Sequence, residues 1–477
     1  MKQVTLCPWI VQTRPAAKSL LEALLAKYPY ASILLTDSKA KNYSISRSGI
    51  SVNANTSFGD RGAVVRIYDG KGYAEYATNM LSHARIPEIL QTLSDRLAPI
   101  AGALPAGLVS EEMGALSDES ITFEKATDYE VHPAELGDEA ILNKLSSIRE
   151  KALAHDERIL DTVTFATYQE YHKLFLSNHK DLTQSVLWMS AGAAVLASRG
   201  EEIKESYRGF SGLGGAEVLD RMDGEIINIA NSTLALLDAE PMEPGTYDCI
   251  CSPETTGMIV HEAFGHGVEM DMFVKDRALA KSYIGKPVAS SLVTMHDGAC
   301  AAREVATYFF DDEGMLAKDT VVIEKGILKQ GICDAQSALS LGCEPTGNGR
   351  RESYARKAYT RMTNTFFEGG TDTLEDMIAS IEYGFLLEEP SSGMEDPKNW
   401  GIQCMVNVAK EIKDGKLTGR IFSPIVLTGY VPDLLKSISM MTPNVELGGG
   451  GACDKGYKEW VKVSDGGPYI KAKIRLG

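Results

Sequence analysis

Residues 252–271, SPETTGMIVHEAFGHGVEMD, combine a helix start with two closely spaced histidines. Ser252 is a favourable N-cap, Pro253 suits the first helical position, and Glu254 places an acid in the first turn. The apolar residues that can pack this helix against a core are Met258, Ile259, Val260 and Phe264. The stretch therefore predicts a helix that carries both imidazoles about two turns from its start.

The two histidines, His261 and His266, are five residues apart, in the pattern HExxxH. A regular helix turns by about 100° per residue, so this spacing separates the two rings by about 140°. A single π-turn, closed by an i→i+5 hydrogen bond, brings the rings back to one side. Gly265 and Gly267 lower the backbone cost of such a turn.

This motif has the composition of a zinc site, because imidazoles bind Zn²⁺ and the carboxylate of Glu262 can take a proton from activated water. A catalytic zinc site needs a third protein ligand. One candidate is Glu269 or Asp271, just downstream. The other is Cys453 in GGGGACDKG (448–456), where Lys455 favours a thiolate. The glycine run is alternatively a flexible or anion-binding loop, but not a Walker motif, because no GK[ST] follows.

The composition is that of a folded protein that does not bind nucleic acid. The 477 residues include 48 Lys+Arg and 65 Asp+Glu, a net charge of −17, with 44% hydrophobic residues. The pI near 5.1 and the lack of a basic block match a phosphate backbone poorly.

No segment predicts export or a membrane span. The longest nearly apolar stretch, Ser185 to Ser198, is shorter than the roughly 18 residues that a span needs. The eight cysteines are scattered, without a disulfide framework. We therefore expect a cytoplasmic protein with reduced thiols.

The first hundred residues predict a helix, an antiparallel meander and a second helix. Apolar spacing gives helices at 16–28 and 86–97, and strands at 31–35, 50–53, 62–68 and 73–78. A similar order follows residue 138, with a helix at 139–154, strands at 159–167 and 173–176, a strand pair within 186–197, and a helix from Ala216.

The two segments align weakly, Gly62–Val65 with Gly192–Val195 at an offset of about 130, which suggests a duplicated unit. The expected subdomains are 1–98 and 136–240, joined by a linker at about 99–135. Pro241 and Pro244–Gly245 mark a boundary near residue 240. The predicted fold class is α+β, with an N-terminal α+β region (1–240) and a β-rich C-terminal catalytic domain (241–477).

Several C-terminal motifs together resemble the TldD/PmbA family of zinc metallopeptidases, once described as modulators of DNA gyrase. They are HEAFGHGVEMD (261–271), FDDEG (310–314), GNGRRESY (347–354), RMTNT (361–365) and the GGGGACDKG segment. TldD-type subunits carry HExxxH and TldE/PmbA-type partners have lost it, so this chain is similar to the TldD type. Ala358–Thr360 departs from the family pattern, in which a proline-containing stretch is expected.

The resemblance implies roles for individual residues. His261 and His266 correspond to the imidazole ligands, Cys453 to the thiolate ligand, and Glu262 to the catalytic glutamate. It further implies one Zn²⁺ per active subunit, unfolded or small peptides as substrates, and a dimer, commonly with a TldE/PmbA-type paralogue.

The expected reaction is peptide hydrolysis with Glu262 as the base. Candidate substrate-binding or oxyanion-stabilising residues are His296, Tyr354, Arg350 and Arg351, the arginine pair being suited to clamp a substrate carboxylate. The acids in FDDEG are expected in a solvated turn. The many short strands suggest that substrate adds to a strand edge.

Two other functions remain open from the sequence. One is a non-catalytic regulator or binding subunit of the gyrase-modulator type, against which the intact His261, Glu262, His266 and Cys453 argue. The other is a zinc hydrolase of a non-peptide amide.

Overall fold

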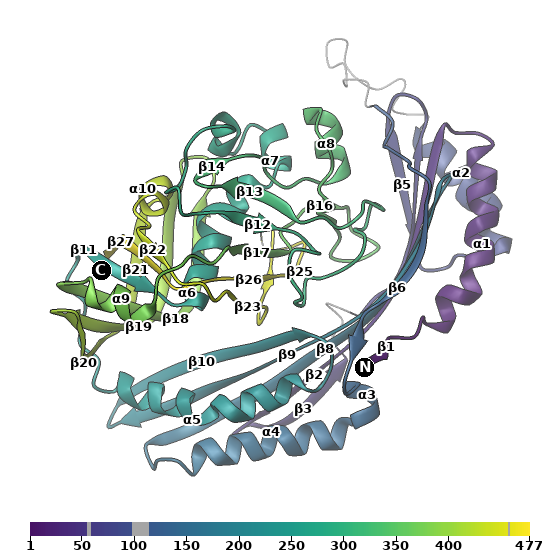
Figure 1. Ribbon diagram of the computed structural model, residues 1–477. Helices are drawn as coiled ribbons and strands as arrows, with labels where there is room; N and C mark the ends of the chain where they lie inside the picture. Colours follow the sequence, from purple (N-terminus) through teal and green to yellow (C-terminus); the bar gives the residue numbers. More distant parts are fainter. Residues whose placement is uncertain (55–58, 98–113, 457) are drawn as a thin grey trace.

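The computed structural model describes residues 1–54, 59–97, 114–456 and 458–477. Figure 1 shows a long curved sheet from the N-terminal half, helices on its outer face, and the C-terminal half against its inner face. The elements of the N-terminal half are β1 (Lys2–Gln3), α1 (Pro8–Leu25), β2 (Tyr30–Ser46), β3 (Gly49–Ala54), β4 (Arg61–Tyr68), β5 (Tyr73–Thr78), η1 (His83–Arg85), α2 (Ile86–Leu97), β6 (Ile121–Ala126), β7 (Asp128–Tyr129), α3 (Pro133–Leu136), α4 (Asp138–Leu153), β8 (Ile159–Ser177), β9 (Lys180–Arg199), β10 (Glu202–Leu213) and α5 (Val218–Leu236).

The curved sheet contains eight strands in the order β10-β9-β8-β2-β4-β5, with β3 paired to β2 and β6 paired to β9. Each half of the sheet is a helix, a meander and a helix, and the two halves meet where β2 and β8 pair antiparallel. Thr36 pairs with Gly62 in the first half, and Phe165 pairs with Gly192 in the second. These pairs are related by offsets of 129 and 130, which agrees with the weak sequence alignment of the two segments.

The strand predictions erred where the strands are longest. The strands expected at 159–167 and 173–176 form one strand, β8, and the pair expected within 186–197 is the single strand β9, whose partner β10 was not predicted. Gly192, which suggests a turn, instead lies under an aromatic ring, because a Cβ there would be 2.5 Å from Cζ of Phe165. The glycine therefore serves packing within a strand.

The predicted linker is only partly a linker. Residues 99–113 lie outside the described residues, and the remainder contains β6, which pairs parallel with β9, together with β7 and the start of α3. The boundaries of the two subdomains and the division near residue 240 stay predictions.

The C-terminal half is rich in strands. Its elements are β11 (Gly245–Cys251), α6 (Pro253–Met258), η2 (Ile259–Gly265), η3 (His266–Val268), α7 (Asp271–Val274), η4 (Leu279–Tyr283), β12 (Met295–Asp297), β13 (Thr320–Glu324), β14 (Ile327–Leu328), α8 (Ala335–Leu341), β15 (Gly349–Arg350), β16 (Tyr359–Thr360), β17 (Asn364–Phe367), α9 (Leu374–Ala379), β18 (Tyr383–Asp396), β19 (Gly401–Lys413), β20 (Lys416–Phe422), β21 (Ile425–Tyr430), α10 (Val431–Lys436), β22 (Met440–Met441), β23 (Glu446–Gly448), β24 (Ala452–Cys453), β25 (Val461–Lys462), β26 (Ser464–Gly467) and β27 (Ile470–Leu476). The chain is thus α+β with a β-rich C-terminal region.

Two sheets hold the histidine-bearing helix. One runs β11-β18-β19-β21-β27-β22, and β27 also pairs with β11, which closes its first five strands into a barrel. The other runs β14-β13-β12-β17-β26-β23. The predicted packing residues Ile259, Val260 and Phe264 are fully buried in the core cluster, and Met258 is 8% exposed. This burial fixes the helix and the side chains on its opposite face.

The two halves are joined by a buried ion network. Arg66 of β4 donates to Glu75 of β5 and to Glu313, at 2.7 Å each, and Arg351 donates to Glu75 at 2.6 Å. The acids of FDDEG, Asp311, Asp312 and Glu313, are buried, so the prediction of a solvated turn was wrong. Their cationic partners, Arg66 and Lys173, lie in the N-terminal sheet, which the local sequence does not reveal.

None of the eight cysteines forms a disulfide. No helix among the described residues combines the length and the apolar character needed to cross a membrane.

Arg66→Met is expected to lower the free energy of unfolding by about 3–5 kcal/mol, because it leaves the buried carboxylate of Glu313 without its cation. The measurement is the shift in urea midpoint. Arg85→Met is the control, since Arg85 pairs with Glu88 at the surface. Equal midpoints for the two variants would contradict the role given to the network.

Candidate metal centre

The helix that carries the histidines contains the predicted π-turn. Ser252 caps α6, its Oγ accepting from the amide of Thr255, and Pro253 is the first helical residue. Residues Ile259–Gly265 then form a π-helical segment, closed by a hydrogen bond from the His266 amide to the His261 carbonyl. The five-residue spacing and the π-turn thus match, and both rings face the same side.

Position 265 needs glycine, because Met362 packs closely against the π-turn there. A Cβ at this position would lie 2.3 Å from Sδ of Met362 and 3.2 Å from the carbonyl oxygen of Val260. A side chain therefore displaces either the turn or the segment around Met362.

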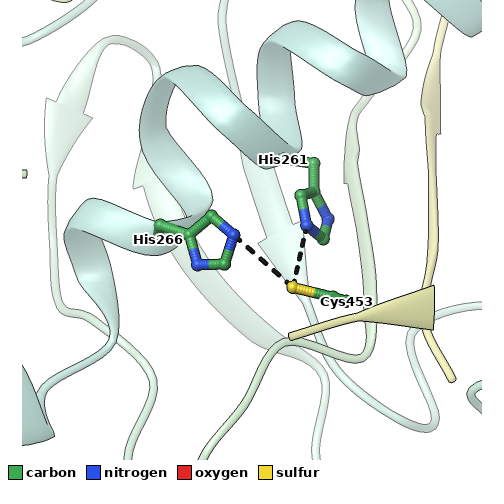
Figure 2. A group of neighbouring side chains, drawn as sticks. All are labelled: His261, His266 and Cys453. Atoms are coloured by element: carbon green, nitrogen blue, oxygen red, sulfur yellow. Dashed lines mark hydrogen bonds between the residues drawn. The ribbon is translucent and has the colours of Figure 1, made fainter. Parts of the chain in front are cut away.

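The π-turn brings His261 and His266 to Cys453 of β24 (Figure 2). Nε2 of His261 lies 3.3 Å from the sulfur, and Nε2 of His266 lies 3.5 Å from it. The three ligand atoms lie within 4.8 Å of one another. Residues almost two hundred positions apart in the chain therefore form one cluster.

The donor set and the spacing fit zinc. Typical Zn–N and Zn–S lengths give an N···S edge of about 3.5 Å in a tetrahedral site, close to the two observed distances. Burial opposes ionisation of Cys453, but its hydrogen bonds to the two imidazoles outweigh burial and lower the pKa of the thiol to about 5. The sulfur is therefore a thiolate at neutral pH, the form that binds metal.

Each imidazole has a carboxylate behind it. Nδ1 of His266 lies 3.4 Å from Glu269, and Nδ1 of His261 lies 3.9 Å from Asp465. Carboxylates in these positions orient imidazole ligands and raise their basicity. The structure thus places Glu269 behind a ligand.

Asp271, the other downstream candidate, points to Lys455. Nζ of Lys455 donates to Asp271 at 2.8 Å and to Glu269 at 3.0 Å. Burial raises the pKa of Glu269, but the charge of Lys455 and the bond to His266 outweigh it and hold that pKa well below its ordinary value. Of the alternatives left open by the sequence, Cys453 is the one that the structure brings to both histidines.

Arg361 is the main residue that the residue patterns missed. Its side chain is fully buried, and Nη2 donates to the sulfur of Cys453 at 3.0 Å. Nη1 donates to the carbonyl of Glu459, and Nε lies 3.5 Å from Glu269. The guanidinium thus holds the thiolate and the carboxylate behind His266 together. The only signal was its place in RMTNT, which says nothing about its partners.

Glu262 lies beside the cluster. Its carboxylate is 3.9 Å from Nε2 of His266 and is partly exposed. Burial raises its pKa above the ordinary value, and the charges of the two histidines oppose that rise. A carboxylate of raised basicity next to a ligand nitrogen is suited to accept a proton from water.

The arginine pair does not reach the cluster. Arg351 is committed to Glu75, with bonds of 2.6 and 3.2 Å, so the expected clamp on a substrate carboxylate is instead an internal ion pair. Arg350 donates to the carbonyl of Met362 at 2.7 Å and lies over the ring of Tyr308.

Tyr354 and His296 are placed elsewhere too. The Tyr354 ring covers Gly62 of β4, and its amide donates to Asp60. His296 stacks on Phe366 and bonds Asp319 and Glu368 at 2.6 and 2.8 Å. Burial lowers the pKa of His296, but these two carboxylates outweigh it and raise the pKa. Among the described residues, neither side chain contacts the metal cluster.

Gly265→Ala is expected to weaken zinc binding by about 10-fold, because a new methyl group forces the π-turn against Met362. The dissociation constant is measured by competition with a chelating dye. Gly448→Ala, where nothing lies within 4 Å of the added Cβ, is the matched control. Equal affinities in both variants would contradict the role of the close packing.

Zinc binding at pH 7 is expected to release protons from the imidazoles. Burial opposes protonation of His261 and His266, but the Cys453 thiolate outweighs it and raises both pKa values. A raised pKa increases the protonated fraction of each imidazole, and zinc binds neutral imidazole, so affinity rises with pH. Calorimetry in buffers of different ionisation heat measures the release. Cys453→Ser should release fewer protons, and a wild-type protein that releases none contradicts the scheme.

Comparison with known proteins gives a consistent family. Residues 244–475 match the model of the PmbA/TldA metallopeptidase C-terminal domain. A metalloprotease of Methanocaldococcus jannaschii is 25% identical over 94% of this chain and 97% of its own length. A protein of Saccharolobus solfataricus named zinc metalloprotease TldD homolog is 28% identical over 53% of this chain and 56% of its own.

Two solved structures share the fold. A Thermotoga maritima protein described as a modulator of a DNA gyrase has a TM-score of 0.77 at 16% identity, covering 97% of this chain and 100% of its own. TldE from Thermococcus kodakarensis has a TM-score of 0.76 at 17% identity, with the same coverage. The C-terminal region of this chain, residues 244–475, therefore belongs to the TldD/PmbA family.

Proposed function

We propose that this protein is a zinc-dependent peptidase of the TldD type, with His261, His266 and Cys453 as ligands of one Zn²⁺ per chain and Glu262 as the catalytic base. The observation that carries the proposal is the convergence of two Nε2 atoms on one thiolate, at 3.3 and 3.5 Å, beside a carboxylate. The metalloprotease names of the relatives, one of which specifies zinc, support it.

The chain's own residues have separable tasks in this proposal. Asp465 and Glu269 orient the imidazoles, Arg361 holds the thiolate, and Lys455 fixes Glu269. Bound zinc supplies a Lewis acid that makes water nucleophilic near neutral pH. Glu262 accepts the water proton and returns it to the leaving amine. Because Glu262 directly follows His261, the turn that positions the ligand also positions the base.

The proposed substrates are unfolded or small peptides, bound as an added strand. The edge strand β23 of the six-stranded sheet supports this idea, since it ends at Gly448, shortly before the strand that carries Cys453. An added strand is read through its backbone, which tolerates varied side chains. A co-crystal structure with peptide bound away from any strand edge contradicts this mode.

We further propose a dimer, either with a TldE/PmbA-type paralogue or with a second copy, acting in the cytoplasm. The likeness in fold to a protein named TldE supports a partner of the same fold. The net charge of −17 argues against nucleic acid as a direct partner.

Two other functions compete with this one. A non-catalytic modulator agrees with the description of the Thermotoga structure, but it has no need for a thiolate held by two imidazoles and an arginine. A hydrolase of a non-peptide amide uses the same cluster and differs only in its substrate. Cleavage of an unstructured polypeptide distinguishes both from the peptidase.

Glu262→Gln is expected to retain stoichiometric zinc and to lose hydrolysis by about 10²–10⁴-fold, because the amide cannot accept the proton. Zinc content is measured by atomic absorption, and cleavage of an unstructured polypeptide by mass spectrometry, with and without a TldE-type partner. Glu254→Gln is the matched control on the same helical segment, since Glu254 pairs with Arg208. Undiminished cleavage by Glu262→Gln would sink the assigned base.

A further inference from the structure

A pocket lies between the two halves of the chain, next to the metal cluster. Strands β2, β8 and β9 line one side of it, and residues 305–312, 350–354 and 460–462 line the other. Its volume of about 90 Å³ exceeds what one water needs, about 10–15 Å³, so it accepts a small group of atoms. Aromatic rings form much of its wall, among them Tyr171, Trp188, Tyr308 and Trp460.

The pocket adjoins the strand that carries the thiolate. Val461, one of its lining residues, pairs with Cys453 across β24 and β25. Arg350, another lining residue, bonds the carbonyl of Met362, which directly follows the arginine that holds the thiolate. The pocket and the thiolate are thus connected through the paired backbones of β24 and β25.

Two cations line the pocket without a carboxylate as an ion-pair partner, Lys462 and Arg350. Among the residues that the structure describes, neither has a carboxylate oxygen within 4.0 Å of its charged nitrogens. The other two cations are committed elsewhere: Lys173 bonds Asp312, and Arg351 bonds Glu75. Acidic and basic side chains both line the pocket, and Lys462 and Arg350 are the lining cations for which the described residues offer no close carboxylate.

Lys462 is the more unusual of the two, because it is only 6% exposed. Its ammonium meets only neutral oxygens at hydrogen-bond distance, Oγ of Ser190 at 3.4 Å and the carbonyl of Gly450 at 3.2 Å, and it lies 4.9 Å from the ring centroid of Trp188. Burial lowers its pKa to about 7, and the more distant charge of Glu304 only partly opposes this. A buried ammonium without a counter-charge is costly, so an anionic ligand that enters the pocket relieves that cost.

The acids nearby do not fill this role. Glu304 is buried, and its carboxylate accepts a hydrogen bond from the hydroxyl of Ser211. Asp311 accepts three backbone amides, while burial, together with the charge of Glu313, raises its pKa to about 8. The other acids that line the pocket have partners too: Asp312 pairs with Lys173, Asp60 accepts from the amide of Tyr354, and Glu352 accepts from the amide of Glu459. Lys462 and Arg350 therefore stay available to a group from outside.

We propose that this pocket binds a carboxylate of the peptide substrate through Lys462 and Arg350, and so selects peptides with an acidic group close to the cleaved bond. The carboxylate comes either from the peptide's C-terminus or from an Asp or Glu side chain. The assignment rests on the proposed peptidase function, but it concerns binding and is tested without turnover.

The experiment measures peptide binding to the zinc-loaded Glu262→Gln protein. The probes are four versions of one unstructured ten-residue peptide, with a free or amidated C-terminus and with Glu or Gln at an internal position. Tryptophan fluorescence reports occupancy, because Trp188 and Trp460 line the pocket, and calorimetry gives the dissociation constants. The carboxylate peptide is expected to bind about 10-fold more tightly than its neutral counterpart. If amidation of the C-terminus weakens binding, the bound carboxylate is that of the C-terminus. If replacement of Glu by Gln weakens binding, it is that of the side chain.

Lys462→Met in the same background is expected to abolish that preference, whereas Lys462→Arg should keep most of it. Lys462→Met should fold, because it removes a buried charge and keeps the side-chain volume. The control is Lys416→Met, at an exposed position in β20. Equal affinity for all four peptides, binding of none, or a preference that survives Lys462→Met each overturns the proposal. Cleavage by Glu262→Gln instead contradicts the catalytic base and leaves the pocket assignment untouched.

Discussion

The thiolate of Cys453 is the point on which the metal centre depends. Its sulfur accepts from Arg361 at 3.0 Å and lies within 3.5 Å of both imidazoles, and Cys453 itself is buried. Without the thiolate, the two imidazoles and the guanidinium of Arg361 would lose the one anion that all three share, because among them Glu269 contacts only His266 and Arg361, and Asp465 lies behind His261. The negative charge of the sulfur therefore holds three separate segments together before any metal enters.

The π-turn is the second condition, and the sequence predicts it well. A spacing of five forces the rings apart in a regular helix, so either the helix deforms or the histidines do not act together. Gly265 shows which outcome holds, since it allows the turn to lie against Met362. Arg361 directly precedes Met362, so the segment that packs against the π-turn also carries the guanidinium that holds the thiolate.

Contacts between residues far apart in the sequence were predictable only in part, because a local pattern does not identify a distant partner. Local periodicity identified the longer helices of the N-terminal half and most of the strands of its meanders, but it placed no individual strand in the C-terminal half. It could not show that Arg351 bonds Glu75, 276 residues away, or that the acids of FDDEG meet cations of the other half. Charged residues in a row resemble a solvated turn unless their partners are known. Cys453 was one of two alternatives on residue chemistry alone, and the resemblance to a family decided between them.

The charge of the whole chain limits how a carboxylate can be recognised. A net charge of −17 repels anions at long range, but salt screens that repulsion beyond about 8–10 Å. Recognition then has to act at contact distance, where a buried ammonium such as Lys462 interacts strongly with an anion. That ammonium contacts Trp188 and Ser190 of β9 and the carbonyl of Gly450 in the glycine run. The long N-terminal sheet is therefore part of the substrate site: the half of the chain without the metal ligands builds one wall of the pocket beside them.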